Sequence, residues 1–205
     1  MNPYRIAFIL SCLMGAGSAS AGLSCNSDAI VINDNAVAGT YPSSITTSGG
    51  PSSIISVTVQ VNSLTHTFPD DIGIVLVGPG GQALLLQAGA GDVVSGANGL
   101  TYGFDDAAAN PLPNLNSWAA GVYKPTNYYQ ALDNFPAPGP GTTYSNPGPG
   151  GTGTATFSSV FAGTNSNGTW NLFVADFASG DAGSIGGWCI DFTGTPVSLQ
   201  NFSID

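Results

Sequence analysis

Short apolar runs, separated by turns rich in glycine and proline, are the feature that most restricts the fold of this chain. In residues 55–61, apolar and polar side chains alternate, which predicts a strand with Ile55 and Val57 on a buried face. Residues 72–77 are almost continuously apolar, as in a strand covered on both faces or in the centre of a sandwich. Further strands are predicted at residues 29–33, 83–87, 100–104, 154–161, 169–175 and 187–193. This pattern predicts an all-β fold, a jelly-roll-like β-sandwich.

The segment from Asn110 to Gly153 differs from the rest because it is dense in proline and aromatic residues. Proline removes backbone donors and blocks helices, so we expect a long Pro/Gly-rich surface loop that crosses the sandwich. The aromatic side chains give this loop apolar surface that it can bury, so we expect the segment to be ordered. Four of them are predicted binding residues: Trp118, Tyr123, Tyr128 and Tyr129. Deleting residues 134–150 is predicted to abolish binding and to spare the fold.

The first 21 residues have the pattern of a secretory signal peptide. Arg5 precedes an apolar run, and the small residues Ala19, Ser20 and Ala21 end the segment, so we expect cleavage after Ala21. The alternative, a membrane anchor, needs roughly 20 apolar residues, and this run is shorter and broken by Ser11. We therefore expect a secreted protein with one domain at residues 22–195 and a flexible tail at 196–205.

The charge of the processed chain is strongly negative. Lys124 is its only basic residue, and all twelve acidic residues remain, which gives a formal charge of 1 − 12 = −11. A chain with one cation cannot neutralise a phosphate backbone or bind an anionic membrane surface, so neither nucleic acid nor a membrane is an expected partner. Every acidic residue is Asp, which favours turns and places the acids in loops.

Two cysteines remain after removal of the leader, Cys25 near the start and Cys189 near the end. In an oxidising compartment we expect them to form a disulfide bond. The alternative is a pair of buried free thiols, which mass spectrometry of the unreduced protein would detect.

Several segments together resemble the P domain (P/Homo B domain) that follows the catalytic domain of subtilisin-like proprotein convertases. They are Leu64-Thr65-His66-Thr67 with Asp70-Asp71-Ile72, then Val77-Gly78-Pro79-Gly80, Phe104-Asp105-Asp106, Asn171-Leu172-Phe173-Val174 and Gly187-Trp188-Cys189-Ile190. The resemblance spans roughly Ser24 to Thr193 and is greatest to the bacterial secreted form of the domain. It implies a jelly-roll sandwich that stabilises a protease and tunes its response to pH and Ca²⁺ without cleaving anything.

The chain departs from this family in two ways. It contains no subtilisin-like catalytic domain, so the resemblance transfers no protease activity. Where family members commonly read Asp-Leu-Asp or Asp-Ile-Asp, this chain has Asp71-Ile72-Gly73, which removes one possible metal ligand.

The sequence offers no set of residues for catalysis. A Ser-His-Asp triad needs a base, and the single histidine, His66, lies at a strand end where we expect a hydrogen-bonded structural imidazole. Zinc hydrolysis normally needs several His or Cys ligands, which one His and a bridged Cys pair do not supply. Hydrolysis by two carboxylates is formally open, but nothing in the sequence places two Asp residues in one cleft.

A calcium site is the one cofactor that the acidic loops suggest. Ca²⁺ takes six to eight oxygen ligands from carboxylates and loop carbonyls. The preferred ligands are Asp71 and Asp106, with Asp70 and Asp105 behind them; Asp92, Asp176 and Asp181 rank second. The alternative is that these acids cap turns and keep the surface soluble.

Three classes of function follow. The first is extracellular binding of a protein or polymer by a secreted, non-catalytic module. The second is an accessory partner of a separate subtilisin-like serine protease, and the third is a structural surface protein. The sequence does not choose among their ligands.

Overall fold

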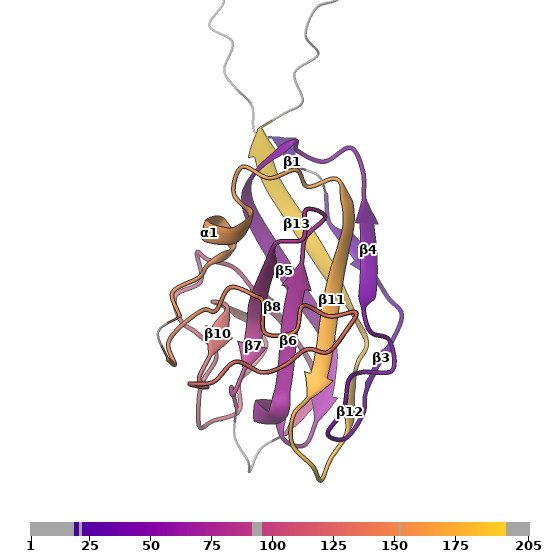
Figure 1. The fold of residues 1–205 in the computed structure, drawn as a ribbon, viewed down its shortest axis with the longest axis vertical. Coiled ribbons are helices and arrows are strands. Elements are labelled where there is room, and N and C mark those ends of the chain that lie inside the picture. The colour runs from indigo at the N-terminus through magenta and orange to yellow at the C-terminus, as the bar shows by residue number, and fades with distance from the viewer. Residues whose placement is uncertain (1–18, 21, 92–95, 152, 196–205) are drawn as a thin grey trace, which may run out of the picture.

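Two β-sheets packed face to face make up the described part of the chain in the computed structural model, which covers residues 19–20, 22–91, 96–151 and 153–195 (Figure 1). One sheet contains β1 (Ala19–Ser20), β2 (Ser24–Asn26), β3 (Ile30–Ile32), β5 (Ser53–His66), β8 (Ala97–Phe104), β9 (Val122–Tyr123), β12 (Gly183–Ile185) and β13 (Gly187–Thr195). The other contains β4 (Ser43–Thr47), β6 (Ile72–Val77), β7 (Ala83–Ala88), β10 (Thr126–Asn127) and β11 (Gly168–Asp176). The helical elements are the 3₁₀ turn η1 (Pro69–Asp71) and the short helix α1 (Phe157–Phe161). The predicted all-β, jelly-roll-like sandwich is confirmed.

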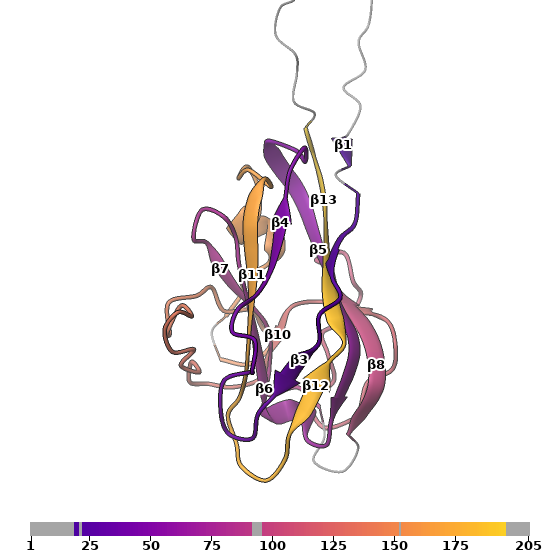
Figure 2. The same ribbon diagram turned by 90° about the vertical axis from the view of Figure 1, so that its right-hand side faces the viewer.

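Two of the crossings of the chain between the sheets lie at the same end of the sandwich. The long strand β5 pairs with β13, β8 and β12 in the eight-stranded sheet, and η1 then leads into β6 of the five-stranded sheet. β11, which pairs with β6 and β4, leads back through a loop to β12. Figure 2 shows the two sheets edge-on, with both connections at the lower end. The end of β5 and the end of β11 are therefore brought together.

The main core lies between the sheets and is rich in large aromatic side chains. Trp170 of β11 and Phe192 of β13 pack with ring centroids 4.9 Å apart, and both rings are buried. Their neighbour Trp188 donates its indole N–H to the Ser43 hydroxyl at 3.0 Å, which satisfies the polar atom that its burial would otherwise leave unpaired.

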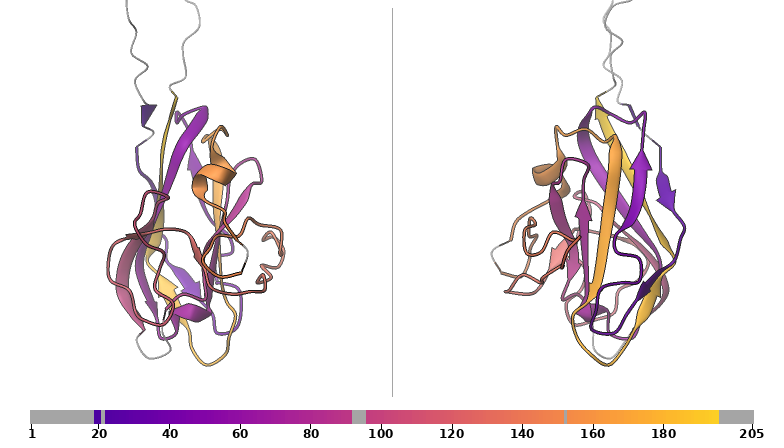
Figure 3. Two further views of the ribbon diagram at one scale, coloured as in Figure 1. Left: turned by 90° about the vertical axis from the view of Figure 1, so that its left-hand side faces the viewer. Right: turned by 45° about the vertical axis from the view of Figure 1, so that its right-hand side comes forward.

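A second apolar cluster covers the outer face of the five-stranded sheet. Val75, Leu85 and Phe173 of this sheet pack there with Phe135, which belongs to the long segment 110–153 (Figure 3). The apolar strand β6 is therefore covered on both faces, as predicted, and the surface loop is confirmed as an ordered layer. Removing residues 134–150 would take Phe135 away and uncover this cluster, so we expect the deletion to disturb the fold as well as binding.

The predicted strand at residues 154–161 is a helix. The Thr156 hydroxyl accepts from the Ser159 N–H and the Ser159 hydroxyl accepts from the Thr156 N–H, which is a capping box. Asp106, distant in sequence, accepts from the N–H groups of Phe157 and Ser158 at 2.9 and 2.8 Å. Phe157 and Phe161, four residues apart, then lie on one buried face of α1.

Ile55 is exposed, contrary to the prediction that it shares a buried face with Val57. A register irregularity in the pairing of β5 with β13 leaves Ile55 unpaired, since Thr193 opposes Ser56 and Gly194 opposes Ile54. This β-bulge turns Ile54 inward, where it is 2% exposed, and Ile55 outward, where it is 55% exposed.

Cys25 and Cys189 form the predicted disulfide bond, which joins the facing residues of β2 and β13 across 164 positions of sequence. Within the described residues, no helix has the length and hydropathy that crossing a bilayer requires. Residues 1–18 and 196–205, which hold most of the predicted leader and the tail, lie outside the described part. Ala19 and Ser20 of the predicted leader form β1 against β13.

Candidate functional site

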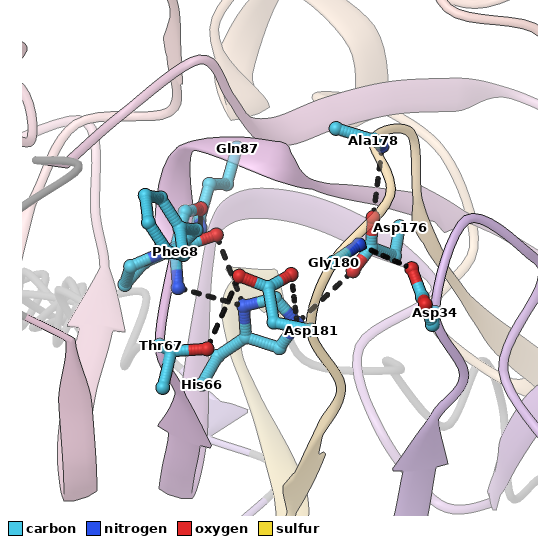
Figure 4. A network of polar contacts seen from close by, with 10 residues as sticks. Asp34, His66, Thr67, Phe68, Gln87, Asp176, Ala178, Gly180 and Asp181 are labelled. Atoms are coloured by element: carbon cyan, nitrogen blue, oxygen red, sulfur yellow. Dashed lines mark hydrogen bonds and ion pairs between the residues drawn. The ribbon is translucent and has the colours of Figure 1, made fainter.

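A cluster of one histidine and four aspartates lies where the chain crosses between the sheets. His66 ends β5, Asp70 and Asp71 belong to η1, Asp176 ends β11, and Asp181 lies in the loop before β12. Figure 4 shows the imidazole of His66 facing the carboxylates of Asp176 and Asp181. Strands from both sheets thus supply this cluster.

Both ring nitrogens of His66 are engaged inside the protein. Nε2 lies 3.1 Å from Asp176 Oδ2, and the two side chains are fully buried. Nδ1 lies 3.0 Å from the carbonyl oxygen of Phe68 and 3.2 Å from its backbone nitrogen. The expected hydrogen-bonded imidazole at the strand end is therefore present, with a buried carboxylate as its partner.

The aspartates of the cluster are fixed by different groups on their two oxygens. Asp176 Oδ1 accepts from the Ala178 N–H at 2.9 Å, and Asp181 Oδ2 accepts from the Thr67 hydroxyl at 3.1 Å. Asp181 Oδ1 is buried without a hydrogen-bond partner and lies 3.9 Å from His66 Nε2. The Asp181 side chain is 7% exposed, so solvent does not replace the missing partner.

The electrostatic environment of the cluster disfavours so many negative charges. Burial, together with the charges of Asp70, Asp176 and Asp181, raises the pKa of Asp71 to about 6, and His66 partly opposes this shift. Burial also raises the pKa of Asp176, against the effect of its bonds from Ala178 and His66. The cluster would gain from a bound positive charge.

The geometry of His66 does not suit general-base catalysis. A base in a Ser-His-Asp triad uses one nitrogen for the carboxylate and the other for the nucleophile. In the described part of the chain, the hydrogen bonds of His66 go to Phe68 and Asp176, and none goes to a serine hydroxyl. The hydrogen bonds of His66 in the described residues therefore do not form the pattern of a Ser-His-Asp triad.

The predicted calcium ligands are divided between two places. Asp70 and Asp71 lie in the cluster, whereas Asp106 caps α1, which lies toward the other end of the sandwich (Figure 1). Asp105 caps its own turn by accepting from the Ala107 N–H at 2.8 Å. Asp71 and Asp106 thus do not share one site, and calcium binding itself stays a prediction.

Two second-rank candidates, Asp176 and Asp181, lie closest to His66. Among the described residues, these three are the group whose potential metal-binding atoms all lie within 4.8 Å of one another. Sequence analysis placed these two aspartates in the second rank. Asp176 is the last residue of β11, which pairs with β6, and Asp181 lies five positions further on, so the pairing of these strands brings both beside η1. Asp92 lies outside the described residues.

A side chain at position 73 would not reach the acidic cluster. A Cβ at this position would lie 2.5 Å from Cε2 of Phe177 and 2.9 Å from Cζ of Phe135. Both rings belong to the apolar layer over the five-stranded sheet. A carboxylate at position 73 would point into that layer and not into the acidic cluster.

The predicted binding aromatics differ in their exposure. Trp118 is 7% exposed and packs edge-on against Tyr102, so it anchors the long segment in the core and offers little ring surface to a ligand. Tyr123, Tyr128 and Tyr129 are half-buried, and their hydroxyls donate to the carbonyl oxygens of Ala119, Leu112 and Asp70. Their role in binding stays a prediction.

Asp133, in the long segment, is expected to make the stability of the protein depend on pH. Burial raises its pKa to about 6, so the folded state holds this proton more tightly than the unfolded state. Its contribution to stability is therefore fully present below pH 4 and is lost as the pH rises through 6. Asp133→Asn should raise the free energy of unfolding on the order of 1 kcal/mol at pH 7.5, after allowance for partial exposure, and change little at pH 4. Urea unfolding at both pH values measures this, and an equal effect at both would contradict it.

The fold was compared with known proteins. No protein-family model matches the chain, and a search of curated proteins found no match. Two solved structures are similar to it: the serine protease of Aeromonas sobria in complex with its chaperone ORF2, at 20% identity and a TM-score of 0.47, and the serine protease of Aeromonas sobria, at 17% identity and a TM-score of 0.45. The similarity covers 88% and 87% of this chain but only 28% and 27% of the matched chains, so the chain spans just over a quarter of their length.

Proposed function

We propose that this chain is a secreted, non-catalytic module of the P-domain type that acts as an accessory partner of a separate subtilisin-like serine protease. The segments that resemble the P domain form the central strands β5, β6, β11 and β13 and the cluster around His66. The bonds of His66 leave no nitrogen for a nucleophile, which supports a role without catalysis.

The observation that carries the proposal is a partly apolar surface with several clefts on the ordered segment 110–153. We call it the loop face and define it by Leu115, Tyr128, Tyr129, Gln130 and Leu132. Three clefts of about 170, 540 and 380 Å³ are lined by members of this face. Leu115 is 74% exposed and Leu132 is 42% exposed, although both belong to a segment that is fixed by buried anchors.

Ordered aromatic and aliphatic side chains around clefts are typical of protein-binding surfaces, because little conformational entropy is lost when they bind. The loop face is held in place by Trp118 and Phe135, which are buried in the two apolar clusters. A partner would therefore meet a preformed surface and not a mobile loop.

The proposal is tested with the processed protein and a subtilisin-like protease purified from the same culture medium. We expect the two to co-elute in size-exclusion chromatography and the protease to survive heating for longer in the complex. Leu115→Asp with Leu132→Asp should weaken the complex at least tenfold. The matched control is Val31→Asp with Ile55→Asp, which places the same charges on exposed apolar residues elsewhere and should leave binding unchanged.

Two results would contradict the proposal. One is a protease that neither binds the protein nor gains lifetime; retention of the protein on an insoluble polysaccharide would then favour polymer binding. The other is equal binding by both double variants, which would exclude the loop face as the docking surface.

A further inference from the structure

At the crossover end of the sandwich, the side chains of His66, Asp176 and Asp181 each have one possible metal-binding atom that faces the other two side chains. We call the space between these three atoms the common point. For each residue, the outward atom is held by another group: His66 Nδ1 by the Phe68 carbonyl at 3.0 Å, Asp176 Oδ1 by the Ala178 N–H, and Asp181 Oδ2 by the Thr67 hydroxyl. The inward atoms are His66 Nε2, Asp176 Oδ2 and Asp181 Oδ1. Nε2 lies 3.1 Å from Asp176 Oδ2 and 3.9 Å from Asp181 Oδ1, and each of the three residues offers a ligand atom within 4.8 Å of the others. This arrangement is more than a group of acids, since each side chain is oriented by its own partner.

A proton on His66 satisfies only part of this arrangement. An Nε2–H can donate to Asp176 Oδ2 at 3.1 Å, but it is 3.9 Å from Asp181 Oδ1, beyond hydrogen-bond distance. Asp181 Oδ1 then stays buried and without a partner, in a side chain that is 7% exposed. An unpaired buried carboxylate oxygen is costly to the fold. A cation at the common point would satisfy all three inward atoms at once.

The charges around the common point also favour a cation. Asp71 lies close enough to Asp176 and Asp181 for their charges to raise its pKa. After the leader, Lys124 is the only basic residue of the chain, and it lies in a cleft with Asp106 near α1. The processed chain therefore has no lysine or arginine beside this cluster, and His66 is the one basic side chain in it.

We propose that His66, Asp176 and Asp181 form a three-ligand site for a small divalent cation of the zinc type. Zn²⁺ accepts one imidazole nitrogen and carboxylate oxygens, with bonds of roughly 2.0–2.2 Å, whereas Ca²⁺ takes oxygen ligands. Around a tetrahedral ion such bonds place ligand atoms roughly 3.3 Å apart, close to the 3.1 and 3.9 Å found between Nε2 and the two oxygens. A metal-bound histidine commonly donates its other N–H to a backbone carbonyl. With a proton on Nδ1, the Phe68 carbonyl at 3.0 Å accepts it; in the other tautomer the Phe68 N–H, 3.2 Å away, donates to Nδ1.

The site would act as a link between the sheets. His66 ends β5 of one sheet and Asp176 ends β11 of the other, so an ion bound to both ties the sandwich together where the chain crosses over. The three side chains are nearly inaccessible, which suits a structural ion. The three proposed ligands are not part of the loop face, although Asp70 of the cluster lines one of its clefts and accepts from the Tyr129 hydroxyl. Zn²⁺ binding and protease binding are measured separately, so failure of one proposal can be told apart from failure of the other.

The site is tested with tag-free processed protein, treated with chelator and titrated with Zn²⁺ alone. We expect one Zn²⁺ per chain, and at 100 times the dissociation constant the folding equilibrium constant should rise about 100-fold. With the cysteines bridged and His66 the only histidine, the processed chain offers no other nitrogen or sulfur side-chain ligand of the usual kind. Absence of binding, or displacement of Zn²⁺ by equimolar Ca²⁺, would overturn the assignment.

The single histidine makes the ligand directly observable by nitrogen NMR. Zn²⁺ should shift the ¹⁵N resonance of His66 Nε2 while Nδ1 keeps its proton, which donates to Phe68. Unchanged imidazole resonances in the presence of bound Zn²⁺ would place the ion elsewhere and overturn the proposal.

A matched pair of variants distinguishes the loss of a ligand at the site from a general change in the net charge of the protein. Asp181→Asn keeps the size of the side chain and an acceptor for the Thr67 hydroxyl, and it should weaken Zn²⁺ binding at least tenfold. Asp28→Asn makes the same charge change at an exposed position and should leave the affinity unchanged. Equal affinity in Asp181→Asn and the native protein would exclude Asp181 as a ligand.

Discussion

Replacing both cysteines, as Cys25→Ser with Cys189→Ser, is expected to lower the free energy of unfolding by roughly 5 kcal/mol in the chain-entropy treatment of cross-links. The bond joins residues 164 positions apart, so it restricts nearly the whole unfolded chain. In the folded protein it holds the short strand β2 against β13, and β2 has only three residues of its own. Such a loss is a large part of the stability of an ordinary domain.

Urea unfolding followed by tryptophan fluorescence measures this effect, because Trp170 and Trp188 are buried in the core. The control is reduction of the native protein, which should reproduce the instability of the double variant. The double variant itself should not respond to the reductant. A double variant as stable as the oxidised protein would show that packing of β2 and β13, without the bond, is sufficient.

The strands could be predicted where the residues of the strand itself determine its structure. Residues 72–77 are apolar throughout, and they form β6 with the same bounds, covered on both faces. The pattern failed where a distant residue decides the local structure. Asp106 accepts from the first turn of α1 at sequence separations of 51 and 52 positions, and the pairing of Gly194 with Ile54 produces the bulge that exposes Ile55. Neither contact can be recognised from the sequence of the segment whose structure it changes.

The candidate site was predictable only in part for the same reason. The sequence singled out His66 as a structural imidazole and Asp71 as an acidic loop residue, and both lie in the cluster. It paired Asp71 with Asp106 because each lies in an Asp-Asp step beside a strand. The actual neighbours, Asp176 and Asp181, are brought in by the return of the chain from β11 to β12, which is a property of the topology and not of any local motif.

Gly73→Asp, which places an aspartate two positions after Asp71, is expected to destabilise this protein by at least about 3 kcal/mol. Gly73 is buried in the middle of the five-stranded sheet, paired with Ala175. Its missing side chain leaves room for the rings of Phe135 and Phe177, which pack edge-on to one another with centroids 5.3 Å apart. The substitution forces these rings apart and places a charge among them, where no cation lies close.

Gly73→Ala separates the steric effect from the charge. It should cost roughly 1–3 kcal/mol, as overpacking does in other cores, and the remaining difference from Gly73→Asp measures the burial of the carboxylate. Gly121→Asp is the control, since a Cβ at that exposed glycine meets Tyr123 no closer than 3.5 Å. Unchanged urea unfolding of Gly73→Asp would mean that Phe135 and Phe177 move aside readily. The long segment would then be a loose cover and not an ordered layer, and the loop face would lose the rigid support on which its proposed binding role depends.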